Sequence, residues 1–193
     1  MAIHITTYRQ FIGANALVTF SNQIAGGFFG VNSIAATYTG LIVNCIQLLS
    51  NAVALFSFTK YFGRRPMILF GSITVTLVNL GLGISLFFEM EYIILTMMCV
   101  YMLFFGSTFF PVSWSVPSEI IPSKDAIYAN VPGWIATSIV VSCPPIIQAH
   151  MHDGNVYPIF LFFGAYGIFG SIILYKWFVE TKGKTYEQII KEF

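Results

Sequence analysis

Long apolar runs separated by short polar breaks are the main pattern along this sequence of 193 residues. An α-helix needs roughly 20 apolar residues to cross the core of a bilayer. Six runs of about that length occupy residues 11–36, 40–59, 67–88, 92–115, 127–149 and 157–178. The pattern therefore predicts an all-α membrane protein with a bundle of six transmembrane helices over residues 11–178. A polar segment, 1–10, precedes the bundle, and a charged tail, 179–193, follows it.

The composition makes a lipid bilayer the expected surroundings of the chain. Hydrophobic residues account for 56% and charged residues for 9%, whereas soluble domains carry roughly 25% charged residues. The net charge of +1 argues against nucleic-acid binding. Cys45, Cys99 and Cys143 are far apart and have no histidine cluster beside them, so we expect no metal site and no cofactor. No nucleophile–base pair or phosphate loop is evident, which argues against an enzyme.

The basic residues predict the orientation, because Lys and Arg are enriched in cytoplasmic loops. All nine fall on one side of a six-span arrangement, and the loops on the other side contain none. We therefore expect both the segment 1–10 and the tail 179–193 in the cytoplasm. Either the plasma membrane or a vacuolar or other internal membrane fits this pattern. No acidic residue lies within the apolar runs, so no proton carrier is evident.

Amide side chains in the first two spans form a candidate substrate site. Asn22 and Gln23 lie in the first span, and Asn44, Gln47 and Asn51 share one face of the second at i, i+3, i+7 spacing. Uncharged amides suit a neutral, polyhydroxylated ligand, but they also hold membrane helices together by hydrogen bonds. Several amides on adjacent spans favour a wet cavity over packing alone.

Trp114 is a second candidate, because Pro111 and Pro117 flank it near the end of the fourth span. Prolines interrupt helical hydrogen bonding, so the sequence predicts a broken helix whose tryptophan closes over a substrate. An ordinary interfacial tryptophan is the alternative.

Charged residues cluster at the expected cytoplasmic ends of the spans. Arg64 and Arg65 precede the third span, and Glu119 follows the fourth. Pairing between them would latch a cytoplasmic gate, and the alternative is ordinary solvated loop charge.

Several motifs resemble those of the sugar porter family in the major facilitator superfamily. Residues 62–66, F-G-R-R-P, resemble its G-R-R loop. Residues 111–114 and 118–122, P-V-S-W and S-E-I-I-P, resemble its P-x-x-W and S-E-I-F-P motifs at family spacing. Residues 180–185, E-T-K-G-K-T, resemble its P-E-T-K-G-K-T motif, and 22–26, N-Q-I-A-G, resemble Q-Q-x-S-G of the seventh helix.

The resemblance implies a fold similar to the C-terminal six-helix bundle of a major facilitator transporter, helices seven to twelve. It implies carbohydrate transport by alternating access, with an N-terminal six-helix half or a second copy as partner. It assigns sugar contacts to Gln23, an amide near Asn44, and Trp114. The positions that it assigns to a cytoplasmic latch are Arg64, Arg65, Glu119 and Glu180.

Some residues depart from the family pattern. Lys60 replaces an acid in the latch, Asn22 replaces a glutamine, and Phe28 stands where an asparagine is expected five residues after Gln23. Three other readings remain open. These are a truncated or split product without transport of its own, a sensor or interaction protein on the same fold, and a transporter of a non-sugar solute.

Overall fold

The structure, a computed structural model, describes residues 1–193 except 31–32, 123–124, 151–155, 185 and 193. Residues 31–32 of the first expected span and Thr185 of the tail motif therefore lie outside the described residues. The regular elements of the described part are all helices. Its elements are α1 Ala2–Phe11, α2 Ala14–Phe29, α3 Ile34–Val53, the π-helical turn η1 Ala54–Phe58, α4 Thr59–Tyr61, α5 Arg64–Phe87, α6 Glu91–Phe104, the π-helical turn η2 Phe105–Phe109, α7 Phe110–Ile120, α8 Ala126–His150, α9 Tyr157–Trp177 and α10 Tyr186–Glu192.

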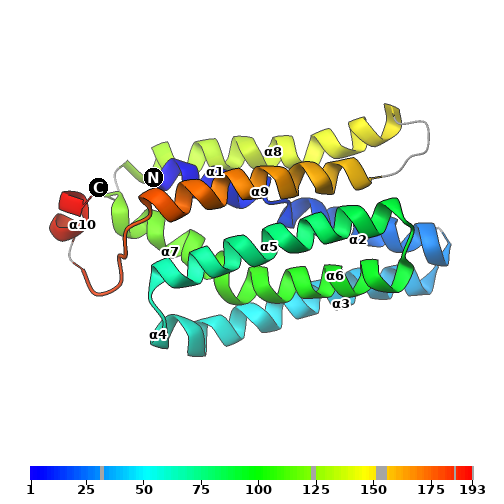
Figure 1. The fold of residues 1–193 in the computed structure, drawn as a ribbon, viewed down its shortest axis with the longest axis horizontal. Helices are drawn as coiled ribbons and strands as arrows, with labels where there is room; N and C mark the ends of the chain where they lie inside the picture. Colours follow the sequence, from blue (N-terminus) through cyan, green and yellow to red (C-terminus); the bar gives the residue numbers. More distant parts are fainter. Residues whose placement is uncertain (31–32, 123–124, 151–155, 185, 193) are drawn as a thin grey trace.

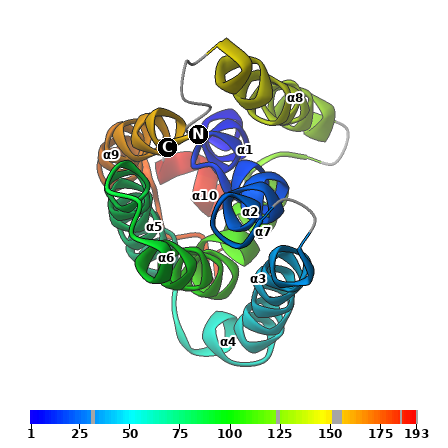
Figure 2. The same ribbon diagram turned by 90° about the vertical axis from the view of Figure 1, so that its right-hand side faces the viewer.

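These elements assemble into rods that run side by side along the long axis (Figure 1). Among the described residues, four continuous helical stretches are long and apolar enough to cross a membrane: Ile34–Tyr61, Arg64–Phe87, Glu91–Ile120 and Tyr157–Trp177. The rod of α1 and α2 and helix α8 complete the arrangement, so the all-α bundle expected from the apolar runs is confirmed. The end-on view shows α1 and α2 among the other helices (Figure 2).

The first rod begins at Ala2 rather than at residue 11, because the expected leading segment 1–10 is itself helical. Helix α1 packs against α7, α8 and α9. Ile5 and Tyr8 are fully buried, and the Tyr8 hydroxyl lies 2.7 Å from Ser72 Oγ. Hydropathy understates burial here, since polar side chains of this segment find partners inside the bundle. The side of the membrane that this end faces stays a prediction.

The first rod is interrupted between α1 and α2. Gly13 has a φ of 86°, a left-handed conformation that glycine adopts without strain. The Ile12 carbonyl at the end of α1 accepts hydrogen bonds from Asn79 Nδ2 at 2.8 Å and from the Tyr101 hydroxyl at 2.6 Å. Both donors are fully buried. The interruption is therefore a fixed feature of the core, where buried side chains replace a lost helical hydrogen bond.

The break expected around Pro111 and Pro117 lies elsewhere. Helix α7 continues through Pro117 to Ile120, and the irregular turn is η2, which ends just before Phe110. A proline ring clashes with the carbonyl four residues earlier, which for Pro111 lies within η2. The wider π-helical turn relieves that clash without breaking the rod.

Candidate functional site

A polar cavity lies where the break in the first rod faces α3, η2, α7 and α8. Its volume is about 170 Å³. A guanidinium, three amides, a threonine hydroxyl and two indoles contribute to its wall, together with apolar groups. The lining residues are Arg9, Gln10, Ala14, Asn15, Gln47, Phe105, Phe110, Trp114, Trp134 and Thr137.

The polar groups of the cavity contact one another across the break. The side-chain amides of Gln10, on α1, and Asn15, on α2, lie 2.7 Å apart. The guanidinium carbon of Arg9 lies 3.8 Å from the centre of the Trp114 ring, a cation–π contact. Arg9 is only 7% exposed and Trp114 is 46% exposed. One face of the indole is therefore covered by a buried positive charge.

Two of the substrate residues expected from the sequence line this cavity: Gln47 and Trp114. Arg9, Gln10 and Asn15 also line it. Arg9 and Gln10 were missed because the polar segment 1–10 was placed outside the spans, and Asn15, inside the first span, was missed as well. The family pattern itself carried a usable signal. The glycine and the asparagine expected three and five residues after its second glutamine follow Gln10, as Gly13 and Asn15.

The other three expected substrate residues do not line the cavity. Gln23 is exposed on α2. Asn44 Nδ2 donates to the Gly40 carbonyl, one turn earlier on α3, at 2.8 Å. A side chain at Gly40 would overlap the amide of Asn22, so Asn22 occupies the close approach of α2 to α3. For Asn22 the structure therefore favours the alternative role of helix packing.

The expected latch residues meet at the start of α5. Arg64 Nη2 lies 3.2 Å from Glu119 Oε1, so α5 and α7 share an ion pair. The Glu180 carboxylate accepts the backbone N–H of Arg64 at 2.7 Å and that of Arg65 at 3.0 Å. The Thr181 hydroxyl donates to Glu119 Oε2 at 2.5 Å. We call Arg64, Glu119, Glu180 and Thr181 the α5 cluster.

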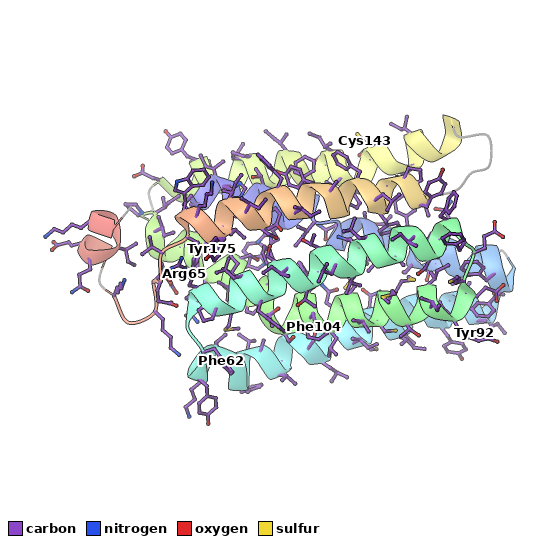
Figure 3. All side chains as sticks on the ribbon, in the orientation of Figure 1. Phe62, Arg65, Tyr92, Phe104, Cys143 and Tyr175 are labelled. Atoms are coloured by element: carbon purple, nitrogen blue, oxygen red, sulfur yellow. The ribbon has the colours of Figure 1, made fainter. Side chains whose placement is uncertain are left out.

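The Arg65 side chain points away from this cluster to α9. Its guanidinium donates to the Tyr175 carbonyl at 3.2 Å, and both residues lie at the end of the bundle opposite Tyr92 (Figure 3). Lys182 Nζ donates to the carbonyls of Lys60 at 2.7 Å and Phe62 at 2.9 Å. The chain after α9 is thereby tied to the loop before α5.

The pKa of Glu180 reflects its role as the acceptor of this cluster. Burial raises the pKa of the carboxyl, but hydrogen bonds from the backbone N–H groups of Lys182, Arg65, Arg64 and Thr181 lower it more. The net pKa therefore lies below the ordinary value of 4.5. The ionised carboxylate is the form that caps the N-terminus of α5.

The sequences of known proteins place this chain in a transporter family. The model described as sugar (and other) transporter matches residues 1–193. The chain is 27% identical over 200 residues to the D-xylose-proton symporter of Escherichia coli strain K12, covering 98% of the chain and 40% of that protein. It is 26% identical over 201 residues to the glucose facilitated diffusion protein of Zymomonas mobilis, with coverage of 97% and 41%.

Solved structures share the fold. The major facilitator proton:xylose symporter XylE, bound to 6-bromo-6-deoxy-D-glucose, matches with a TM-score of 0.86 at 23% identity, covering 98% of this chain and 41% of that one. The inward open XylE from E. coli matches with a TM-score of 0.83 at 22% identity, with coverage of 98% and 40%. The chain thus spans about 40% of the length of the relatives that it matches. These relatives are integral, multi-pass transporters rather than enzymes, and the chain belongs to the sugar (and other) transporter family.

Proposed function

We propose that this chain is one six-helix half of a carbohydrate transporter that moves a sugar by alternating access. The polar cavity beside Trp114 carries the proposal. Amides donate and accept hydrogen bonds and therefore suit sugar hydroxyls. Gln10, Asn15 and Gln47 supply three of them beside an aromatic face, the combination of apolar surface and few polar groups that is typical of small-molecule sites.

The size of the cavity supports the need for a partner. Complete ligand pockets span roughly 300–1,000 Å³, whereas this cavity measures about 170 Å³. A second six-helix unit, either an N-terminal half or another copy, would supply the remaining wall. The motifs of the tail and of the loop before α5 favour the C-terminal half as the part that this chain represents. Rocking of two such halves around a central site is the usual geometry of alternating access.

The α5 cluster is the proposed cytoplasmic latch. It holds the first residues of α5 to α7 through Arg64 and Glu119, and to the tail through Glu180. The basic residues of the chain favour the cytoplasm for this end and for both termini. Figure 1 shows both ends of the chain near that end of the bundle. The cluster would keep these helix ends together while the half moves as one body.

The test is uptake of radiolabelled sugars into proteoliposomes that contain the chain with whichever six-helix unit copurifies with it. The panel includes D-glucose, D-xylose and D-glucuronate. Trp114→Ala should lower uptake of the transported compound by about tenfold or more, as expected for loss of an aromatic contact to the ligand. Trp177 is the last residue of α9 and is 60% exposed. Trp177→Ala is therefore the matched control, and its uptake should stay within about twofold of wild type.

Two results would contradict the proposal. The first is wild-type protein that takes up none of the compounds, and the second is equal loss of uptake in the two tryptophan variants. Binding without uptake would instead point to the sensor or split-product readings.

A further inference from the structure

Arg9 is a buried charge that no acidic group of the described chain balances. It is 7% exposed, and its Nη1 is buried with no hydrogen-bond partner among the described residues. No acidic side chain occurs among the described residues that line the cavity. The first acidic residue anywhere in the sequence is Glu89. An uncompensated buried charge is strongly unfavourable, so this guanidinium requires an anion from outside the described chain.

The neighbours of Arg9 hold it in place without neutralising it. Trp114 covers one face of the guanidinium at 3.8 Å. When the Gln10 amide is turned so that its oxygen faces Arg9, this oxygen lies 3.1 Å from Nη2 and 3.3 Å from Nε. The Nη1 group remains for a further acceptor. A guanidinium positioned in this way suits a carboxylate, whose two oxygens match its donor geometry.

A second positive feature faces the same cavity. Helix α2 begins there: Gly13 is its N-cap, no side chain caps it, and Ala14 of its first turn lines the wall. The exposed N–H groups of a helix N-terminus attract anions. In transporters with interrupted helices, such half-helix ends face the anionic group of the substrate. Arg9 and the start of α2 therefore favour the same kind of ligand from two sides.

A departure from the family motif at Arg9 also favours an anionic ligand. By the offsets of Gly13 and Asn15, Arg9 stands where the Q-Q motif has its first glutamine. The neutral amide of a glutamine at this position suits a neutral sugar. With Arg9 in its place, a neutral sugar leaves the positive charge unbalanced.

We propose that the transported sugar is a sugar acid, such as a uronate. Its carboxylate binds Arg9 and the N-terminus of α2, and its hydroxyls bind the amides of Gln10, Asn15 and Gln47. Arg9 is then the residue that determines specificity for the acid over the neutral sugar. This inference rests on the proposed function, since it names the substrate class of the same cavity.

The test compares D-glucuronate with D-glucose, which differ only in a carboxylate in place of a hydroxymethyl group. Two of the three tryptophans, Trp114 and Trp134, line the cavity. Tryptophan fluorescence of the full chain, purified in detergent with the six-helix unit that copurifies with it, therefore reports binding. D-Glucuronate should bind at least about tenfold more tightly than D-glucose, as expected for charge-assisted hydrogen bonds. Arg9→Gln should bring the ratio of the two affinities close to one.

Two control variants separate this effect from a general effect of charge. Lys176→Gln removes an exposed basic residue near the end of α9 and should leave the ratio unchanged. Arg9→Lys keeps the charge but loses the forked geometry, so its ratio should be intermediate. Size-exclusion elution and circular dichroism check that each variant is folded. If Arg9→Gln does not fold, the wild-type ratio and the Arg9→Lys ratio still decide the question.

The outcomes distinguish this inference from the proposed function. Wild-type protein that binds D-glucose as tightly as D-glucuronate overturns the sugar-acid inference and leaves sugar transport in place. An unchanged ratio in folded Arg9→Gln also overturns it and favours an acidic residue of the partner half as the counter-charge. Absence of binding for both sugars overturns the inference and the proposed function together.

Discussion

Replacing Glu180 by glutamine should destabilise the start of α5 by about 1.5 kcal/mol. Three backbone N–H groups donate to the carboxylate with good geometry, from Arg64 at 2.7 Å, Arg65 at 3.0 Å and Lys182 at 3.0 Å. Glutamine has the same shape but only one acceptor oxygen, so its amide nitrogen must face one of these donors. Glu180→Gln therefore removes the charge from the cap and leaves one N–H without its partner.

The magnitude follows from the contacts of the carboxylate. Loss of a helix cap costs about 0.5–2 kcal/mol, and hydrogen bonds to charged groups exceed neutral ones by about 1 kcal/mol. Glu180 is only partly buried, and screening by solvent places the expected loss near the middle of the cap range. For a chain of this length, about 1.5 kcal/mol corresponds to a fall in Tm of about 3–6 °C.

Thermal unfolding in detergent, followed by circular dichroism, measures the change. Glu187→Gln, at an exposed position of α10, is the matched control and should alter stability by less than about 0.5 kcal/mol. Gly63→Ala tests the same contact from the other side, because a Cβ at Gly63 would overlap Glu180 Oε2. The loss in the Gly63→Ala, Glu180→Gln double variant should be less than the sum of the two single losses. A Tm for Glu180→Gln that matches Glu187→Gln would refute the capping role.

Two other predictions concern pH and packing. The folded-state pKa of Glu180 lies below the ordinary 4.5. The stability that the ionised carboxylate contributes is therefore complete above about pH 4.5 and is lost as the pH falls through the folded-state pKa. Measured from pH 7 to pH 3, the difference in Tm between wild type and Glu180→Gln should close as the pH falls below about 4.5. Gly170→Ala adds a Cβ that overlaps the edge of the buried Tyr8 ring. This substitution should lower the free energy of unfolding by about 1–3 kcal/mol. Gly27→Ala, with nothing within 4 Å of its Cβ, should be neutral or stabilising by up to about 1 kcal/mol in the same thermal assay, and equal losses would contradict the packing argument.

Hydropathy predicted the bundle well because most of its helices are uniformly apolar over a span's length. It failed at residues 1–10, where Thr6, Tyr8 and Arg9 are polar but buried. The Thr6 hydroxyl donates to the Ala129 carbonyl at 2.7 Å, and Tyr8 bonds to Ser72. Such tertiary partners cannot be read from a local average, because they come from distant parts of the chain.

The candidate site was predicted unevenly for a related reason. Gln47 and Trp114 could be found because a polar or aromatic residue in an apolar run is conspicuous. Arg9 and Gln10 could not be found in this way, since a charge next to a break looks like a loop. The contacts of the α5 cluster were easier to predict: charged residues at span ends have few possible partners, and the structure brings Arg64 to Glu119.

In the proposed transporter, the interruption of the first rod makes ligand affinity depend on the angle between two helices. Gln10 precedes the break and Asn15 follows it, and their side-chain amides lie 2.7 Å apart across it. A ligand that binds both amides therefore acts as a crosslink between α1 and α2. Any bend at Gly13 changes the distance between its two anchor points, so bending and binding are thermodynamically linked in both directions. The Ile12 carbonyl, held by Asn79 and Tyr101, is the fixed pivot of that linkage.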